Sequence, residues 1–207
     1  MKVLEQNSVT QIIQDSLDKS MSYAEYRNLV TYLVETEATS GAEHTKALIN
    51  YTMLNDRRMK RWDKTIKVSE EVIDKMQEQD REVTWLVLTE SWCGDAAHVM
   101  PVMNKLAGLS SKINFKVVLR DDNQDLMNEF LTNGSQSIPK LIAIDKETDA
   151  VLYTYGPRPS IATKMVEDYK EEHGALTPKF KEDLQRWYNK DKGQTAIKDL
   201  IKLIQEN

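Results

Sequence analysis

Apolar residues recur at helical spacing at both ends of the chain, whereas the middle contains short, continuous apolar runs that are typical of strands. From residue 1 to about residue 80 the pattern predicts helices throughout. One of them begins after Ser22-Tyr-Ala-Glu25, which has the hydroxyl and carboxylate spacing of a capping box, and it carries Tyr26, Val30 and Leu33 on one face. We therefore expect the N-terminal part to be a helical extension.

Two further helices are predicted before residue 80. Ser40-Gly-Ala-Glu43 has the spacing of a second capping box, with Gly41 in the turn between two helices. Another helix is predicted from about Ser69 to Gln79, with Met76 facing inward. Both predictions depend on local signals only, because neighbouring elements cannot yet be placed.

The helix after the second capping box has one basic face, formed by Arg57, Lys60, Arg61 and Lys64. Its opposite face is apolar and carries Leu48, Tyr51, Met59, Trp62 and Ile66. We interpret the basic face as solvated, with anion or nucleic-acid binding and partner docking as alternatives. Asn55 falls in the apolar stripe, so if it is buried it needs hydrogen-bond partners on neighbouring elements.

Four strands are predicted in the middle of the chain: Val83–Thr89, Ile113–Leu119, Lys140–Ile144 and Val151–Tyr155. The continuous apolar runs of the first two predict that these strands are buried. Helices are predicted between and after them, at about 95–106, 123–131 and 160–172. Alternation of strands and helices implies parallel pairing. The polar, turn-like residues 145–149 instead predict an antiparallel hairpin of the last two strands.

The chain is predicted to be helical again after Gly174. Thr177 is suited to cap a helix that begins with Pro178, and Gly193 separates a last helix. We therefore expect an α/β fold with a central mixed sheet of about four strands. An N-terminal helical extension (1–66) and a C-terminal helical tail (173–207) should pack on a central domain (67–172), with dimerisation through them as an alternative.

Composition narrows the classes of function. The sequence has 207 residues, a formal net charge of −5 and one cysteine. The negative charge argues against bulk electrostatic binding to nucleic acid. The single cysteine excludes an internal disulfide and any multi-cysteine metal site within one chain, and it fits a reducing compartment. Without an apolar signal core at the N-terminus or an apolar run of ~18 residues, we expect a cytoplasmic protein with no membrane partner.

The cysteine lies in the run Ser91-Trp-Cys-Gly-Asp-Ala96, between a predicted strand and a predicted helix. Pro101 follows eight residues after Cys93, and Ile138-Pro139 comes before the third strand. This set resembles the thioredoxin superfamily, whose pattern is Trp-Cys-x-x-Cys at a strand-to-helix turn, a proline inside the helix, and a later cis-proline. More narrowly, with Gly-Pro-Arg-Pro after the last strand, it resembles a group of bacterial thioredoxin-family proteins with helical extensions. The resemblance implies a thioredoxin-like fold.

Two residues depart from the family pattern. Ala96 stands where the second motif cysteine would be, and Val87 stands where the family has a buried acid six residues before the first cysteine. In thioredoxins that carboxylate assists proton transfer during the reduction of substrate disulfides. Both departures argue against ordinary dithiol turnover, because Cys93 cannot be resolved within the chain.

The chemistry of Cys93 depends on its pKa. A thiol at a helix N-terminus can have a pKa well below that of a free cysteine, which is near ~8.5. Asp95 acts in the opposite direction, because a nearby carboxylate raises the pKa of a thiol. The sequence leaves this balance open. We predict monothiol thiol–disulfide exchange at Cys93 with an external resolving thiol; the alternative is a redox-silent binding module for a peptide or small thiol compound.

The resemblance implies a substrate site around Cys93. In this fold the loop before the cis-proline faces the cysteine and pairs with an extended substrate segment. The residues expected to bind the substrate are Trp92, Gly94, Asp95, Ile138, Pro139 and Arg158. The expected partner is a protein or a low-molecular-weight thiol or disulfide, and no cofactor or metal is called for.

Other charged residues near this site have two interpretations. Arg120, Lys140 and Arg158 lie at strand ends or in loops, where they could bind an anionic thiol compound or could be solvated or paired, with Asp121 a ready partner for Arg120. His98 does not share a helix face with Cys93, so we expect a surface histidine and neither a base nor a metal ligand.

Overall fold

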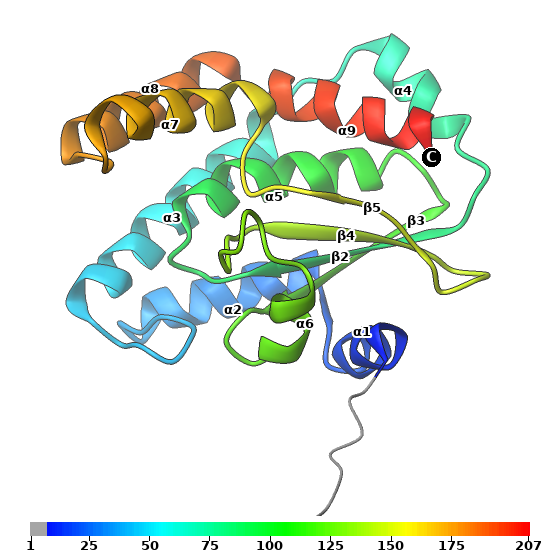
Figure 1. Ribbon diagram of the computed structural model, residues 1–207, viewed down its shortest axis with the longest axis horizontal. Coiled ribbons are helices and arrows are strands. Elements are labelled where there is room, and N and C mark those ends of the chain that lie inside the picture. Colours follow the sequence, from blue (N-terminus) through cyan, green and yellow to red (C-terminus); the bar gives the residue numbers. More distant parts are fainter. Residues whose placement is uncertain (1–7) are drawn as a thin grey trace, which may run out of the picture.

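The computed structural model describes residues 8–207, and the helical and signal-segment expectations for residues 1–7 lie outside that range. Within it a five-stranded mixed sheet has the order β1-β3-β2-β4-β5 (Figure 1). The strands are β1 (Met21–Ser22), β2 (Val83–Thr89), β3 (Ile113–Leu119), β4 (Lys140–Asp145) and β5 (Val151–Tyr155). The predicted α/β fold class, a central mixed sheet with helices before and after it, is confirmed, although the sheet has five strands where about four were predicted.

Strand β2 lies at the centre of the sheet. It pairs in parallel with β3, where Trp85 is opposite Phe115, and antiparallel with β4, where Trp85 is opposite Ala143. All seven residues of β2 are buried. A strand covered on both faces has no solvent side, which explains its continuous apolar sequence. Strands β4 and β5 form the predicted antiparallel hairpin.

Nine helices are described within residues 8–207. They are α1 (Val9–Leu17), α2 (Tyr23–Glu35), α3 (Lys46–Thr65), α4 (Glu70–Gln77), α5 (Gly94–Ala107), α6 (Gln124–Glu129), α7 (Ser160–His173), α8 (Pro178–Asp191) and α9 (Gln194–Glu206). Helix α5 lies on one face of the sheet, and α1, α2 and α6 lie on the other (Figure 1). Helices α3 and α9 pack against α5. The division of the chain at residues 66 and 172 stays a prediction.

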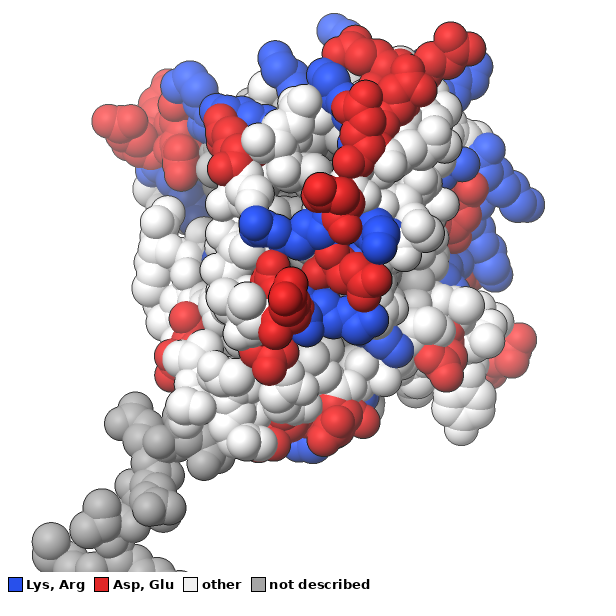
Figure 2. Space-filling model, turned by 90° about the vertical axis from the view of Figure 1, so that its right-hand side faces the viewer, with Lys and Arg blue, Asp and Glu red and all other residues white. Residues whose placement is uncertain are grey.

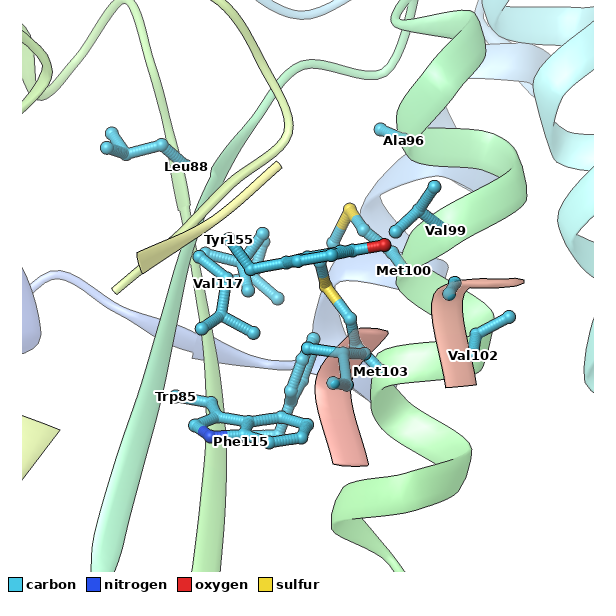
Figure 3. Close-up of a cluster of buried hydrophobic side chains, with 14 of the residues drawn as sticks. Trp85, Leu88, Ala96, Val99, Met100, Val102, Met103, Phe115, Val117 and Tyr155 are labelled. Carbon is cyan, nitrogen blue, oxygen red and sulfur yellow. The ribbon is translucent and has the colours of Figure 1, made fainter. Parts of the chain in front are cut away.

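The main core lies between the sheet and α5. Trp85, Phe115 and Val117 project from the strands toward Met100 and Met103 of α5 (Figure 3). Trp85 is fully buried, and its indole N–H donates to the hydroxyl of Tyr153 at 3.0 Å. A buried indole N–H without an acceptor would be costly, so this hydrogen bond lets the large ring serve as core.

Two local predictions were wrong in the N-terminal part. Ser22 and Glu25 form the predicted capping box of α2, but Ser22 also belongs to β1, a two-residue strand that pairs with β3 and was not predicted. Ser40 caps no helix, because α3 begins at Lys46 and is capped by Thr45. The Ser40 hydroxyl instead donates to the buried carboxylate of Glu90. Tertiary hydrogen bonding thus overrides the local motif.

Charges on the surface are mixed in sign. The face seen in Figure 2 carries basic and acidic side chains next to one another. Glu82, for example, pairs with both Lys112 and Lys146. Among residues 8–207, no helix has the length and apolar character needed to cross a bilayer.

Candidate functional site

Cys93 is the N-cap residue of α5, directly after the turn that follows β2. Its Sγ accepts a hydrogen bond from the Ala96 N–H at 3.4 Å and donates one to the Ile138 carbonyl at 3.2 Å. The residue is 7% exposed. A carbonyl oxygen can accept from a thiol but not from a thiolate, so this contact favours the protonated SH form.

The electrostatic balance at Cys93 favours the neutral form. Burial raises the pKa of the thiol to about 12, and the carboxylate of Asp95 adds to this rise. The N–H groups at the start of α5 and the charge of Arg158 act in the opposite direction but are outweighed. Desolvation of the sulfur thus has a larger effect on the pKa of the thiol than the N–H groups at the start of the helix.

Asp95 lies in the first turn of α5 and is held by two groups. Its Oδ2 is 2.8 Å from Nη2 of Arg158, and its Oδ1 accepts from the Tyr188 hydroxyl at 2.8 Å. Burial raises the pKa of Asp95, and Arg158 opposes that rise. These two contacts connect the turn beside Cys93 to the loop after β5 through Arg158 and to α8, in the predicted C-terminal tail, through Tyr188.

Gly156 brings Arg158 close to this turn. It has a φ of +111°, and a Cβ there would collide with the carbonyl oxygen of Pro139. Glycine is therefore required both for the backbone conformation and for the close approach. The Ile138–Pro139 peptide bond is cis. The Gly156 loop and the proline loop are thus packed backbone to backbone beside Cys93.

A cleft of about 520 Å³ opens beside Cys93. The predicted residues Trp92, Gly94, Asp95, Ile138 and Arg158 line it together with the cysteine. Pro139 is buried behind this lining and is not part of it. Trp92 is half-buried.

Of the other two charged candidates, one lines the cleft and one does not. Arg120 lines the cleft, with its guanidinium 5.1 Å from the Trp92 ring centre and paired to Asp121 at 2.7 Å. Lys140 does not line it; this side chain is buried, and its Nζ donates to Thr132 at 3.1 Å. Burial lowers the pKa of Lys140. Only two of the three predicted cations, Arg120 and Arg158, therefore reach the site.

Several residues of the cleft were not predicted from the sequence. Arg58 comes from α3, and Lys181, Leu184 and Gln185 come from α8. Arg58 follows Asn55 by three residues, and the Asn55 prediction gave the available signal: Asn55 is buried, and its Nδ2 donates to the Ser91 carbonyl at 2.9 Å. An asparagine tied to the motif places the neighbouring turn of α3 above the cysteine.

The prediction of a surface His98 was wrong. His98 is 4% exposed and stacks on Tyr188 with ring centres 4.3 Å apart. Its Nδ1 accepts from the Trp62 indole N–H at 2.8 Å, so the neutral ring carries its proton on Nε2 and donates to Gln185 at 2.7 Å. Burial lowers the pKa of His98 to about 4. Helix α8 covers a position that the local sequence left open.

A polar network supports the motif from behind. Glu90 is fully buried and accepts from the Ser40 hydroxyl and from the Asp121 N–H, at 2.9 Å for the latter. Burial raises the pKa of Glu90, and both hydrogen bonds oppose the rise. Ser91, next to it, bonds the hydroxyls of Thr39 and Thr52. The residues around Cys93 are therefore fixed on both sides.

No group of three or more His, Cys, Asp and Glu side chains within residues 8–207 is arranged to hold a metal ion.

The predicted basic and apolar faces of α3 differ in how well the structure matches them. Arg57, Lys60 and Lys64 are exposed as predicted, but Tyr51, expected on the apolar face, is 47% exposed at the cleft. Its ring is thus available to a ligand and does not belong to the core.

Comparison with known proteins identifies a matching family and confirms the predicted thioredoxin-like fold. Residues 41–170 match a family model described as Thioredoxin. A solved structure of a protein of unknown function from Pseudomonas aeruginosa has a TM-score of 0.65 at 14% identity, covering 97% of this chain and 99% of that one. An HIV epitope-scaffold has a TM-score of 0.57 at 17% identity, covering 90% of this chain and 99% of its own. No curated protein matches the sequence.

Proposed function

Because the family match spans residues 41–170, more than half of the sequence, the chain belongs to the thioredoxin family, and we propose that it binds a peptide or small thiol compound in the cleft beside Cys93 while the thiol stays protonated. The observation that carries this proposal is the Cys93 sulfur itself. It is buried, donates to the Ile138 carbonyl, and has a pKa raised to about 12. A thiol in this state is a poor nucleophile at neutral pH.

The residues around the thiol support binding over dithiol turnover. Ala96 supplies only a backbone N–H to the sulfur, and Val87 is fully buried with no proton to transfer. Gln136, Ser137 and Ile138 line the cleft opposite the motif. An extended segment can pair with the backbone of such a loop in the manner of an added strand.

Binding can be tested without any use of the thiol. We expect a pool of extended hexapeptides to shift the NMR signals of the Trp92 indole N–H and the Ile138 amide, and to do so equally in the wild-type protein and in Cys93→Ser. Shifts in neither protein would overturn the proposal. Shifts in the wild-type protein alone would mean that the thiol itself makes the bond.

Monothiol exchange is the second candidate, favoured by one observation: the sulfur lines the cleft and receives the Ala96 N–H. The Cys93 thiolate would attack one sulfur of a substrate disulfide, forming a mixed disulfide and expelling the other sulfur as a thiol that takes the proton. A low-molecular-weight thiol would then attack the mixed disulfide, regenerate Cys93 and leave with the substrate half as a new disulfide. A bacterial, cytoplasmic setting is part of this proposal, because such a cycle needs a reducing compartment.

The two candidates differ in one product. Incubation with a disulfide reagent and mass spectrometry would detect a mixed disulfide on Cys93 if exchange occurs, and Cys93→Ser is the blank. We expect no adduct at neutral pH on the time scale in which an unfolded control chain is fully modified. Rapid adduct formation by the folded protein would favour exchange.

A further inference from the structure

Arg58 reaches from α3 over the first turn of α5. A Cβ on Gly94 would lie 3.6 Å from Nη1 of Arg58, so the guanidinium is beside the residue that follows Cys93. The side chain is fixed in place: Nη1 donates to Asn55 Oδ1 at 2.9 Å, and Asn55 in turn donates to the Ser91 carbonyl at 2.9 Å. Arg58 is thus attached to the same turn that holds the cysteine.

This guanidinium has no acidic partner of its own. Within residues 8–207, no carboxylate lies within ion-pair distance of Arg58, although it is half-buried. Burial and the nearby charge of Arg61 lower the pKa of Arg58, and the carboxylate of Asp95, beyond ion-pair distance, acts in the opposite direction. An arginine stays charged in proteins. A partly desolvated cation with only one amide acceptor is a group that an incoming anion would stabilise.

The lining of the cleft contains more cations than carboxylates: Arg58, Arg120, Arg158 and Lys181 against Asp95. Arg158 is paired with Asp95, and Arg120 is paired with Asp121 just outside the lining, so Arg58 and Lys181 supply the remaining positive charge. The whole chain has a formal net charge of −5, so this positive lining runs against the overall composition. Attraction between charges is stronger in a partly enclosed cleft than in open water.

The shape of the cleft adds apolar walls to these charges. Leu48 and Tyr51 come from α3, and Leu176 and Leu184 come from the C-terminal part of the chain. A few placed charges among apolar walls are typical of sites for small molecules and peptide segments. The exposed basic face of α3, formed by Arg57, Lys60, Arg61 and Lys64, is not needed for this site, since none of its residues lines the cleft.

From this arrangement we propose that the cleft recognises a carboxylate-bearing ligand, and that Arg58 is the residue that binds the carboxylate. The guanidinium presents two N–H groups in one plane, which matches the two oxygens of a carboxylate. The proposal rests on the proposed function, because the ligand occupies the same cleft beside Cys93. It adds the charge of the ligand and assigns specificity to a residue of helix α3.

The test uses the full chain and defined probes. Citrate represents a small carboxylate compound, hexaglutamate an acidic peptide, and hexalysine a peptide of the opposite charge. Binding is followed by NMR through the Trp92 indole N–H, assigned with Trp92→Phe. We expect citrate or hexaglutamate to shift this signal with saturation, hexalysine to leave it unchanged, and added salt to weaken the binding.

A matched pair of variants separates Arg58 from the general charge of α3. Arg58→Gln should weaken carboxylate binding about tenfold or more, the effect of losing a hydrogen bond to a charged group. Arg57→Gln removes the same charge from the adjacent, exposed position and should change affinity less than about twofold. Gly94→Ala, whose added methyl group fits at van der Waals distance from Arg58, should also weaken binding without unfolding the protein.

The outcomes distinguish this proposal from the function on which it rests. Equal losses in Arg57→Gln and Arg58→Gln, or no shift with either carboxylate probe, would overturn the role of Arg58. If hexalysine or the neutral members of the hexapeptide pool still shift Trp92, the cleft binds peptides and only the charge assignment fails. If no probe shifts Trp92, the proposed function fails with it. A shift of the Trp92 signal with citrate but not with hexaglutamate would identify the ligand as a small compound. A shift with hexaglutamate but not with citrate would identify it as a peptide.

Discussion

Asp95, in the first turn of α5 beside Cys93, forms an ion pair at 2.8 Å with Arg158 of the loop after β5. The pair has two effects on the thiol, since the carboxylate raises the pKa of Cys93 and the guanidinium lowers it. Of the two, Asp95 has the larger effect. The protonated state of the cysteine therefore depends on burial first and on this carboxylate second.

Asp95→Asn should make Cys93 more reactive. Removing the negative charge leaves Arg158 to favour the thiolate, and a charge at this range moves a pKa by about one to three units, so we expect alkylation at pH 8 to be roughly tenfold faster or more. The rate is measured with iodoacetamide, and circular dichroism checks that the variant is folded.

The control for Asp95→Asn is Asp122→Asn, which removes the same charge from an exposed position outside the cleft. Its alkylation rate should match that of the wild-type protein. An unchanged or slower rate in Asp95→Asn would show that the carboxylate does not hold the thiol neutral.

His98 should make stability fall with pH below about 6.5. In the unfolded chain the imidazole takes a proton near pH 6.5, but in the folded protein it does so only near pH 4. Above the higher value both states are neutral. As pH falls between the two values, only the unfolded state gains a proton, so the free energy of unfolding decreases, by up to about 3 kcal/mol.

Urea unfolding at several pH values measures this effect. His98→Gln should lose most of the dependence between pH 6.5 and 4, at a cost in stability at pH 8 because the Trp62 hydrogen bond is disturbed. His173→Gln, at an exposed position, is the matched control and should keep the dependence. If the His98 imidazole of the wild-type protein titrates near pH 6.5 by NMR, the prediction is contradicted.

Ser40→Ala should destabilise the protein more at pH 8 than at pH 4.5. The hydroxyl lowers the pKa of Glu90, which burial has raised, so its loss makes the folded carboxyl harder to ionise. A group whose pKa is raised in the folded state contributes its full stabilisation at low pH, and this contribution is lost as pH rises through the folded pKa. The expected cost at pH 8 is about 1–3 kcal/mol.

Ser111→Ala is the control, because Ser111 is exposed. It should change the free energy of unfolding little at either pH. A cost for Ser40→Ala that is the same at both pH values would mean that only the Ser91 N–H, which also bonds the Ser40 hydroxyl, is affected.

Ala96→Cys tests the position of Cys93 in the motif. Ala96 is 1% exposed, and its N–H is 3.4 Å from Sγ, so a thiol there lies next to Cys93. We expect mild oxidation to form an internal disulfide, seen by mass spectrometry as a loss of two hydrogens and of both alkylatable thiols. Val99→Cys, buried further along α5, is the control and should keep two free thiols.

Much of the central fold could be predicted because its elements are coded locally. Strand β2 has a continuous apolar run since both faces are buried, and Cys93 caps α5 as the motif predicted. The failures have a common cause. Ser40 and His98 looked like a helix cap and a surface residue until Glu90 and Tyr188, distant in sequence, were placed beside them.

The same reason explains which site residues were found. Arg158 was predicted because it lies in a proline-rich loop that the family pattern places near the cysteine. Arg58 was not predicted, because the helical spacing of Arg57, Lys60, Arg61 and Lys64 indicates a basic exposed face and Arg58 lies outside that face. The contact of Asn55 with Ser91 orients the turn bearing Arg58 toward the cleft, which Arg58 lines.

The central claim is that Cys93 is a neutral thiol in a binding cleft. It is tested most directly by the rate of iodoacetamide alkylation as a function of pH, which reports one thiol because the chain has one cysteine. The unfolded protein in urea should titrate near the free-cysteine value of ~8.5. We predict that the folded protein reacts slowly, with a midpoint well above that value and toward 12. A folded midpoint below the unfolded one would contradict the account and identify Cys93 as an activated thiolate.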